Sequence, residues 1–540
     1  MSDPALLVQK NNIVLCFNLQ VDPGVKTKTQ LMAEQSVFKV LLMTVIAASA
    51  EPELQDPNDE FVPNICRHFS MIFHVDSSTT SPSATSGQLE DLMGGANGGL
   101  SSTSQSSCHS NLEELDPLIF LDALVDLLAA ENRAHARAAL IAMNIFIETL
   151  IFLACSKHTV VLAESSIGTP GTPVMVTCPS MNPVSAPPPD VHIPVFEQLL
   201  PRLLHCCYGS TWEAQMGGVM GLGALVDMST REALCRFQVQ AVRSLVYVLQ
   251  RLPQHAYKEQ AETSHVLTHL LGDVNYAAEK NSEHHRQGFQ GVVDFLAAEL
   301  FNPNATLTVR KTVESCLAFL ASRTSIEVSE LLEPVYQPLL RQLIMHPIRS
   351  KGIEQQVGTL MAINYCLSLQ PPLLKMSQEF VSVLQVALQI TEEDENPSAR
   401  KFTIPNLAKL RTVCIELLCT AMAQTDFQIP NHTEMRDRII SMLFKSLKCG
   451  NPEIVTAARD SLHQLMRQHN LPRELIFYNV TQYFLKSVNT GNFTLPLLQG
   501  LARLLELRSN FFSINFGERL LEHLKRWQGK KLDKRQNGFF

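Results

Sequence analysis

The sequence predicts an all-α fold built from successive pairs of helices, and three observations lead to this prediction. Apolar residues recur every three to four positions through most of the 540 residues. The periodic segments come in twos, separated by short polar turns, and no comparable stretch alternates with a period of two. Because one pair of helices cannot bury its apolar side alone, we expect the pairs to stack into a helical-repeat solenoid.

The second helix of each pair begins at a nearly regular interval. The predicted starts lie near Asn132, Thr211, Lys258, Thr308, Lys351, Asn406 and Asn451. After the first interval, which contains an insertion, the spacing is roughly 40–50 residues, as in HEAT or armadillo repeats. The whole chain then corresponds to roughly nine to eleven helix pairs.

Apolar stripes and terminal signals define the individual helices. The stripe over 193–207 consists of Phe196, Leu199, Leu200, Leu203, Leu204 and Cys207. Later stripes consist of Phe289, Val292, Val293, Leu296 and Leu300, of Val309, Val313, Cys316, Leu317 and Leu320, and of Val455, Ala458, Leu462 and Leu465. Asn451 is expected to cap the last of these helices, with Pro452 in its first turn. Pro201 and Pro338 fall inside first helices, where proline is expected to kink the axis, as in HEAT repeats.

Six segments follow from the composition along the chain. Helical repeats are predicted at 1–75, 112–163 and 192–528. Residues 76–111 are rich in Ser, Thr and Gly and are expected to be a disordered insert, and the proline-rich residues 164–191 are expected to be an extended loop. Residues 529–540 are a basic tail. The basic side chains from Lys525 to Arg535 fit either a nuclear-import or acid-binding patch or the solvated end of a helix.

The charge of the chain limits its partners. Lys and Arg number 44 and Asp and Glu 52, which gives a net charge of −8 and argues against nucleic acid as the main ligand. Charged residues make up 18% of the chain, below the roughly 25% of typical soluble domains. This shortfall predicts a surface that is partly covered by other elements or other subunits.

Neither a membrane segment nor a disulfide framework is predicted. The most apolar stretch, 139–155, is shorter than the roughly 20 residues of a membrane span and contains Asn144 and Glu148, so we interpret it as a buried helix. The N-terminus lacks the pattern of a secretory signal. The 13 cysteines include no CxxC motif, and seven of them lie in apolar helical patterns, as expected for buried, reduced thiols of the cytosol or nucleus. These seven are Cys155, Cys206, Cys207, Cys316, Cys366, Cys414 and Cys419.

The histidines and cysteines give no convincing metal site. His265 and His269 have a spacing that can hold zinc, but Val266 stands where an HExxH motif has glutamate, and no third ligand is near. The consecutive residues His205, Cys206 and Cys207 point around a helix, which favours core packing.

Catalytic motifs are also absent. The GxSxG nucleophile elbow and the kinase HRD and DFG motifs do not occur. The acidic cluster Glu392-Glu393-Asp394-Glu395 is expected to be a solvated loop. We therefore predict no catalytic, cofactor-binding or metal-binding residues, and no enzymatic activity.

A glycine-rich segment, MGGVMGLGAL at 216–225, has a structural interpretation. It lacks the GxxxxGK[ST] pattern and follows no strand, so it is not a phosphate loop. Gly218, Gly221 and Gly223 instead lie in a predicted helix that starts near Trp212, where each glycine costs about 1 kcal/mol relative to alanine. Close approach of a neighbouring helix backbone would offset this cost, and Gly221→Leu is expected to disrupt the stacking.

Several long segments resemble the transformation/transcription domain-associated (TRRAP) family, in the form found in plants. They are VKTKTQLMAE (25–34), DPLIFLDALVDLLAAENRAHARAAL (116–140), IPVFEQLLPRLLHCCYGSTWEAQMGGVMGLGALV (193–226), VVDFLAAELFNPNA (292–305), SELLEPVYQPLLRQLIM (329–345) and LLQGLARLLEL (497–507). The resemblance implies a relative of the phosphatidylinositol-3-kinase-related kinases with a long HEAT solenoid, a FAT region and a catalytically inactive kinase-like domain. Only the HEAT part resembles this chain, so we expect a fragment, a truncated gene model or a split product.

The function implied by the resemblance is non-catalytic scaffolding in the nucleus. The family supports SAGA-type and NuA-type histone acetyltransferase complexes in transcription and DNA repair, and it binds transcription activators, so activators and acetyltransferase subunits are the expected partners. No direct contact with nucleic acid, membrane or a small-molecule substrate is expected. Two alternatives are a HEAT-repeat nuclear transport receptor and a helical regulatory region of an active kinase of the same superfamily.

Overall fold

The computed structural model describes residues 28–51, 60–76, 116–165, 193–228, 231–273, 283–392, 405–428 and 430–467, with a few single positions between 499 and 525. It divides into two compact units, residues 1–295 and 296–540, which we describe separately. All regular elements in the described ranges are helices, in agreement with the predicted fold class. The basic tail and most of both predicted inserts lie outside the described residues, although Asp76 ends one helix and residues 164 and 165 end another.

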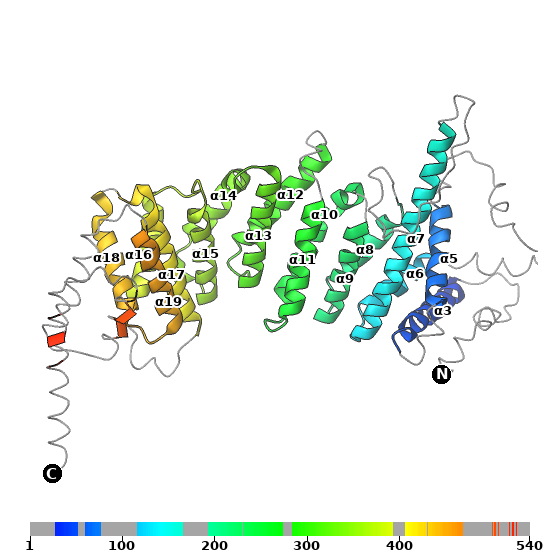
Figure 1. Ribbon diagram of the computed structural model, residues 1–540, viewed down its shortest axis with the longest axis horizontal. Coiled ribbons are helices and arrows are strands. Elements are labelled where there is room, and N and C mark those ends of the chain that lie inside the picture. Colours follow the sequence, from blue (N-terminus) through cyan, green and yellow to red (C-terminus); the bar gives the residue numbers. More distant parts are fainter. Residues whose placement is uncertain are drawn as a thin grey trace, which may run out of the picture. The chain divides into compact units, whose positions relative to one another are not determined.

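The first unit consists of two rows of helices. One row comprises α3 (Lys28–Ala48), α6 (Leu118–Leu128), α8 (Phe196–Cys206) and α10 (Arg231–Arg251), and each helix contacts the next. The other row comprises α5 (Phe61–Asp76), α7 (Arg133–Ser165), α9 (Trp212–Met228) and α11 (Tyr257–Asp273), of which α7, α9 and α11 lie side by side in Figure 1. α12 (Glu283–Leu300) begins in this unit. Two parallel rows are the arrangement expected of stacked HEAT-type pairs.

The second unit repeats this arrangement. Its helices are α13 (Leu307–Thr324), α14 (Val328–Met345), α15 (Ile353–Ser368), α16 (Gln378–Glu392), α17 (Pro405–Ala423), α18 (Thr433–Ser446) and α19 (Pro452–Arg467), with short 3-10 turns at Ile348–Ser350, Thr425–Gln428 and Pro430–His432. α15, α17 and α19 contact one another in succession, as do α14, α16 and α18.

The predicted starts of the second helices are confirmed. All seven, α7, α9, α11, α13, α15, α17 and α19, begin within two residues of the predicted positions. The Oδ1 atoms of Asn132 and Asn451 accept hydrogen bonds from the backbone N–H groups two residues later, each at 2.9 Å, so both asparagines act as caps. Pro201 and Pro338 lie inside α8 and α14 as predicted, and α14 holds a further proline, Pro334.

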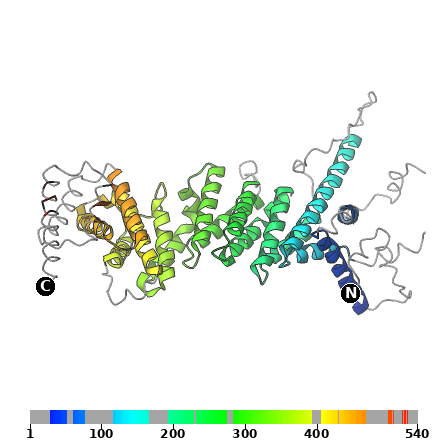
Figure 2. The ribbon, with the colours of Figure 1, turned by 60° about the horizontal axis from the view of Figure 1, so that its bottom comes forward.

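The predicted apolar stripes form the core. All members of the stripes in α8, α13 and α19 are buried, and in α12 only Phe289 is half-buried. The apolar stretch 139–155 belongs to α7, which packs on α3, α5, α6 and α9. Residues 133–156 are long and apolar enough to cross a membrane by length and composition, and 44% of the most apolar window is buried. The C-terminal part of α7 extends beyond the helices beside it (Figures 1 and 2).

The fourth residue of four successive second helices donates hydrogen bonds to the turn before its helix. This residue is Gln215 in α9, Gln260 in α11, Arg310 in α13 and Gln356 in α15. The glutamine Nε2 atoms donate to the carbonyls of Gly209, Pro253 and Lys351 at 2.8, 2.9 and 2.8 Å. Arg310, which is 1% exposed, donates to the carbonyls of Leu300 at 2.8 Å and of Asn302. Burial lowers the pKa of Arg310 to about 10. Backbone carbonyl groups in these turns, which accept no hydrogen bond within a helix, therefore accept one from a side chain.

The glycines of α9 allow neighbouring helices to approach closely. A Cβ atom at Gly217 would overlap the backbone of Leu128 and Ala129 at the end of α6, and one at Gly218 would lie 2.7 Å from the backbone nitrogen of Cys207. The hypothesis of close backbone approach is therefore confirmed for Gly218. At Gly221 the nearest atom belongs to the Leu203 side chain instead of a backbone.

We expect Gly217→Ala to destabilise the chain although alanine is the better helix former. The new methyl group meets rigid backbone, so one helix must shift, at a net cost of about 1–3 kcal/mol. Gly223→Ala is the matched control in the same helix, because its Cβ atom would meet only the Val266 side chain, at 3.1 Å. Urea unfolding followed by circular dichroism compares the two variants. Equal unfolding midpoints would contradict this account of α9.

Most of the described cysteines are buried thiols. Cys206, Cys207, Cys316, Cys366, Cys414 and Cys419 are buried as predicted, and so is Cys66. Cys155, in the C-terminal half of α7, is only half-buried, which corrects the prediction for this residue. Burial raises the pKa of Cys316 and of Cys366 to about 12.

The buried thiols are expected to resist alkylation in the folded chain. At about pH 9 an ordinary thiol is largely ionised, but Cys316 and Cys366 remain protonated and inaccessible. Because the unfolded chain releases these protons at a lower pH than the folded chain, the folded state loses stability as the pH rises from about 9 toward the folded-state pKa values. Mass spectrometry after a short pulse of N-ethylmaleimide should find Cys449, which is half-exposed, modified well before Cys316. Equal labelling in the native and guanidinium-unfolded chain would contradict the burial.

Candidate interaction surfaces

Carboxylate–arginine pairs join consecutive first helices of the repeats. Asp122 of α6 pairs with Arg202 of α8 at 2.6 Å, and Glu197 of α8 pairs with Arg236 of α10 at 2.6 Å. In the second unit, Glu392 of α16 pairs with Arg438 of α18 at 2.7 Å. In each pair the acid lies on the earlier helix and the arginine on the later one. The same contact therefore recurs between neighbouring repeats.

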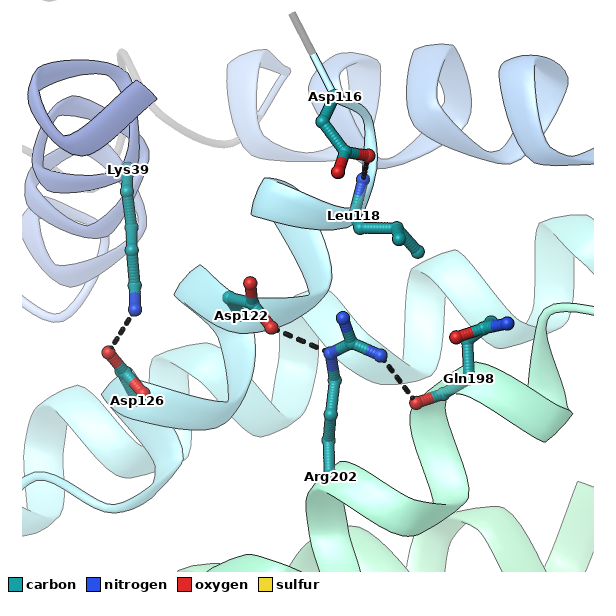
Figure 3. A network of polar contacts seen from close by, with 7 residues as sticks. All are labelled: Lys39, Asp116, Leu118, Asp122, Asp126, Gln198 and Arg202. Atoms are coloured by element: carbon teal, nitrogen blue, oxygen red, sulfur yellow. Dashed lines mark hydrogen bonds and ion pairs between the residues drawn. The ribbon is translucent and has the colours of Figure 1, made fainter. Parts of the chain in front are cut away.

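Figure 3 shows the pairs around α6. Asp126, one turn after Asp122, forms an ion pair with Lys39 of α3, so the two aspartates hold α6 between α3 and α8. Arg202 also donates to the carbonyl of Gln198 at 2.8 Å, which fixes its guanidinium group. These side chains are partly exposed, and exposed pairs contribute only about 0–1 kcal/mol each. We infer that they fix the alignment of neighbouring helices more than they stabilise the fold.

The second helices of the first unit are joined near their N-termini by Arg133. Its guanidinium group lies over the Trp212 ring, 5.3 Å from the centroid, and forms an ion pair with Glu259 at 2.7 Å. The Glu259 backbone N–H group and the Arg133 guanidinium hold the pKa of Glu259 below its usual value. One side chain of α7 thus links α7, α9 and α11.

Two kinds of surface remain after these contacts. On α3 the exposed face is uncharged and includes Met32, Val37 and Val40. On α10 the exposed face is basic and lies beside aromatic side chains. Tyr208, at the end of α8, packs against Tyr247 of α10 with 4.8 Å between ring centroids. The Arg243 guanidinium of α10 lies 5.5 Å from the centroid of the Phe295 ring.

The residues considered for metal binding do not converge. His265 and His269 are exposed on α11 with their rings stacked 6.0 Å apart. His205 is exposed, whereas Cys206 and Cys207 point into the core, as the helical spacing predicts, and Cys206 donates to the carbonyl of Ala214 at 3.2 Å. The part of the chain that the structure describes contains no group of three or more His, Cys, Asp or Glu side chains that could hold a metal ion.

The acidic cluster and the basic tail are described only in part. Glu392 ends α16 and binds Arg438, so the first residue of the acidic cluster joins two helices and is not simply solvated. Glu393 to Glu395 lie outside the described residues, as does the tail after Lys525. A small apolar hollow between α8, α9, α10 and α11, lined by Leu200, Leu222, Phe237 and Leu270 among others, offers almost no polar group for chemistry.

Sequence reasoning missed the pairs between helices and the basic face of α10. Asp122 and Arg202 lie 80 positions apart, and nothing local in the sequence indicates that they meet. The glutamines and the arginine at the fourth helix positions could have been found, because they recur at the interval of the repeat.

Comparison with known proteins identifies the repeat array. The family model described as the Tra1 HEAT repeat ring region matches residues 10–537. The SAGA complex/NuA4 acetyltransferase complex subunit TRA1 of Saccharomyces cerevisiae is 27% identical over 340 residues, which cover 61% of this chain and 9% of that protein. The human transformation/transcription domain-associated protein is 23% identical over 439 residues, covering 76% of this chain and 10% of that protein.

A crystal structure of importin beta aligns with a TM-score of 0.38 and 13% identity, covering 92% of this chain and 53% of that one. The chain spans about a tenth of the length of the curated relatives it matches. The family match covers nearly all of the chain, including every helix described above. The chain therefore belongs to the Tra1 family, within its HEAT repeat ring region.

Proposed function

We propose that this chain is a non-catalytic scaffold part of SAGA-type and NuA-type histone acetyltransferase complexes in the nucleus. In this role it binds transcription activators and neighbouring subunits and thereby brings acetylation to chromatin. The observation that carries the proposal is the match of residues 10–537 to the Tra1 HEAT repeat ring region. Two relatives are named as subunits of the SAGA and NuA4 complexes, and these names support the same role.

The architecture supports binding along extended helix faces. The pairs between Asp122 and Arg202 and between Glu197 and Arg236 hold the first helices at a fixed spacing. Their exposed faces therefore form a preorganised surface, which lowers the entropic cost of docking. Disordered activator segments must become ordered on contact, so each site is expected to bind weakly and several sites to act together.

The chain, expressed with an affinity tag in cells of its source organism, is expected to capture histone acetyltransferase activity from nuclear extract. The assay measures transfer of labelled acetyl groups to histone H3 and H4 peptides by the captured material. A tagged HEAT-repeat protein of another family is the control for non-specific capture. The purified chain alone should acetylate no histone peptide and should phosphorylate no protein.

Two results would contradict this proposal. Recovery of nucleoporins without acetyltransferase activity would favour the transport-receptor alternative. Phosphoryl transfer by the purified chain, abolished by a point substitution within it, would favour the kinase alternative.

A further inference from the structure

The exposed face of α10 has an unusual composition for this chain. Among residues 236–251, whose side chains the structure describes, the exposed ones are Arg236, Gln240, Arg243 and Arg251, and half-buried Tyr247 lies among them. The successive intervals of four, three, four and four residues place all five on one side of the helix. We call this set the α10 stripe. The chain as a whole carries a net charge of −8, so three arginines with no acid among residues 236–251 of α10 are a local feature.

The arginines of the α10 stripe differ in how far they are already paired. Arg236 binds Glu197 at 2.6 Å, but its side chain remains 54% exposed. Within the described ranges, no carboxylate lies within 4 Å of Arg243 or Arg251. Two positive charges of the stripe are therefore available to a carboxylate from another molecule.

Aromatic side chains flank the α10 stripe on both sides. Tyr208, in the turn after α8, is 47% exposed and packs on Tyr247. The hydroxyl of Ser244, a buried residue of α10, donates to the phenolic oxygen of Tyr208 at 3.3 Å. Phe295 of α12 lies beneath the Arg243 guanidinium. A guanidinium group that stacks on a ring keeps its N–H groups directed outward in the plane, where a carboxylate can accept them.

We infer that the α10 stripe, with Tyr208 and Phe295, is a docking site for an acidic amphipathic segment of a partner protein. In such a segment Asp or Glu side chains would bind Arg243 and Arg251, while Phe or Leu side chains pack on Tyr208 and Tyr247. Arg243 and Arg251 are eight residues apart, about 12 Å along the helix, which a partner can match with carboxylates seven or eight residues apart in a helix. This inference rests on the proposed function, whose activator-binding surface it places on one face.

The charges nearby favour a protein segment over nucleic acid. Glu197 lies within the site, and Asp294 is exposed next to Phe295. A continuous phosphate backbone would be repelled by these carboxylates and would find only three arginines. A short acidic segment can place its charges at the arginines and its apolar side chains at the rings. Arg and Tyr are also the side chains most enriched at the centres of protein interfaces.

The experiment uses the full chain and a fluorescent peptide of about 20 residues, long enough to span the α10 stripe, in which Asp and Glu alternate with Phe and Leu. Fluorescence anisotropy gives the dissociation constant. Arg243→Glu should weaken binding by about tenfold or more. Arg323→Glu is the matched control, because Arg323 is also exposed and lies over a ring, 5.3 Å from the Phe319 centroid, but on α13. It should leave the affinity unchanged. If Arg243→Glu fails to fold, Arg243→Gln replaces it in the measurement, because it removes the positive charge without introducing a negative one.

Three further measurements distinguish the outcomes. A peptide with Asn and Gln in place of Asp and Glu should bind the chain much more weakly. Added salt should lower the affinity of the acidic peptide, because it screens the attraction between its carboxylates and the arginines. Equal effects of Arg243→Glu and Arg323→Glu, or stronger binding of a single-stranded oligonucleotide than of the peptide, would overturn the inference. If the chain captures acetyltransferase activity but Arg243→Glu leaves peptide binding unchanged, the site is wrong and the proposed function stands. If Arg243→Glu weakens peptide binding but no acetyltransferase activity is captured, the proposed function fails and the site stands.

Discussion

Neighbouring helix pairs bury one another's apolar sides, and the rest of this structure depends on that contact. The end of α6 approaches α9 so closely that only glycine fits at position 217. In the second unit, Gly358 of α15 lies against the backbone of Pro303 and the guanidinium group of Arg310 in the same way. In both contacts the glycine lies against a backbone, and at Gly358 also against a buried guanidinium group. Neither a packed backbone nor a buried charged group can move without a large cost in free energy. Because such contacts recur, each repeat positions the next, and the array does not need one central core.

This constraint determines where function can lie. Apolar side chains face the adjoining helices, the hollow between α8, α9, α10 and α11 is small and apolar, and the described residues contain no cluster that could hold a metal. The outward faces of the helices remain for recognition. Carboxylate–arginine pairs keep those faces in fixed order, and on α10 they leave Arg243 and Arg251 without a carboxylate partner among the described residues.

The sequence predicted the features that depend on local spacing. The stripe from Phe196 to Cys207 and the cap at Asn451 lie where the 3.6-residue period and the capping preference of asparagine place them. Of the three glycines predicted in α9, Gly218 lies against a neighbouring backbone as expected, because glycine within a helix needs a compensating contact. The family resemblance stated from the sequence is confirmed by the match to the Tra1 HEAT repeat ring region.

Features that depend on distant residues could not be predicted. Arg133 meets Trp212 and Glu259 only after three helices have stacked, and no local pattern marks it. The exposed face of α10 becomes a distinct surface only when α8 brings Tyr208 and α12 brings Phe295 beside it. Cys155 was expected to be buried because its neighbours in sequence are apolar, but burial also requires a helix alongside.

Hydrogen–deuterium exchange of Gly358→Ala tests most directly whether contacts between repeats hold the array together. The account predicts that protection falls together in α13 and α15, which meet around Arg310, while Gly352→Ala, whose Cβ atom meets nothing within 4 Å, leaves protection unchanged. Loss of protection confined to the turn of α15 that contains residue 358, with α13 unaffected, would contradict it.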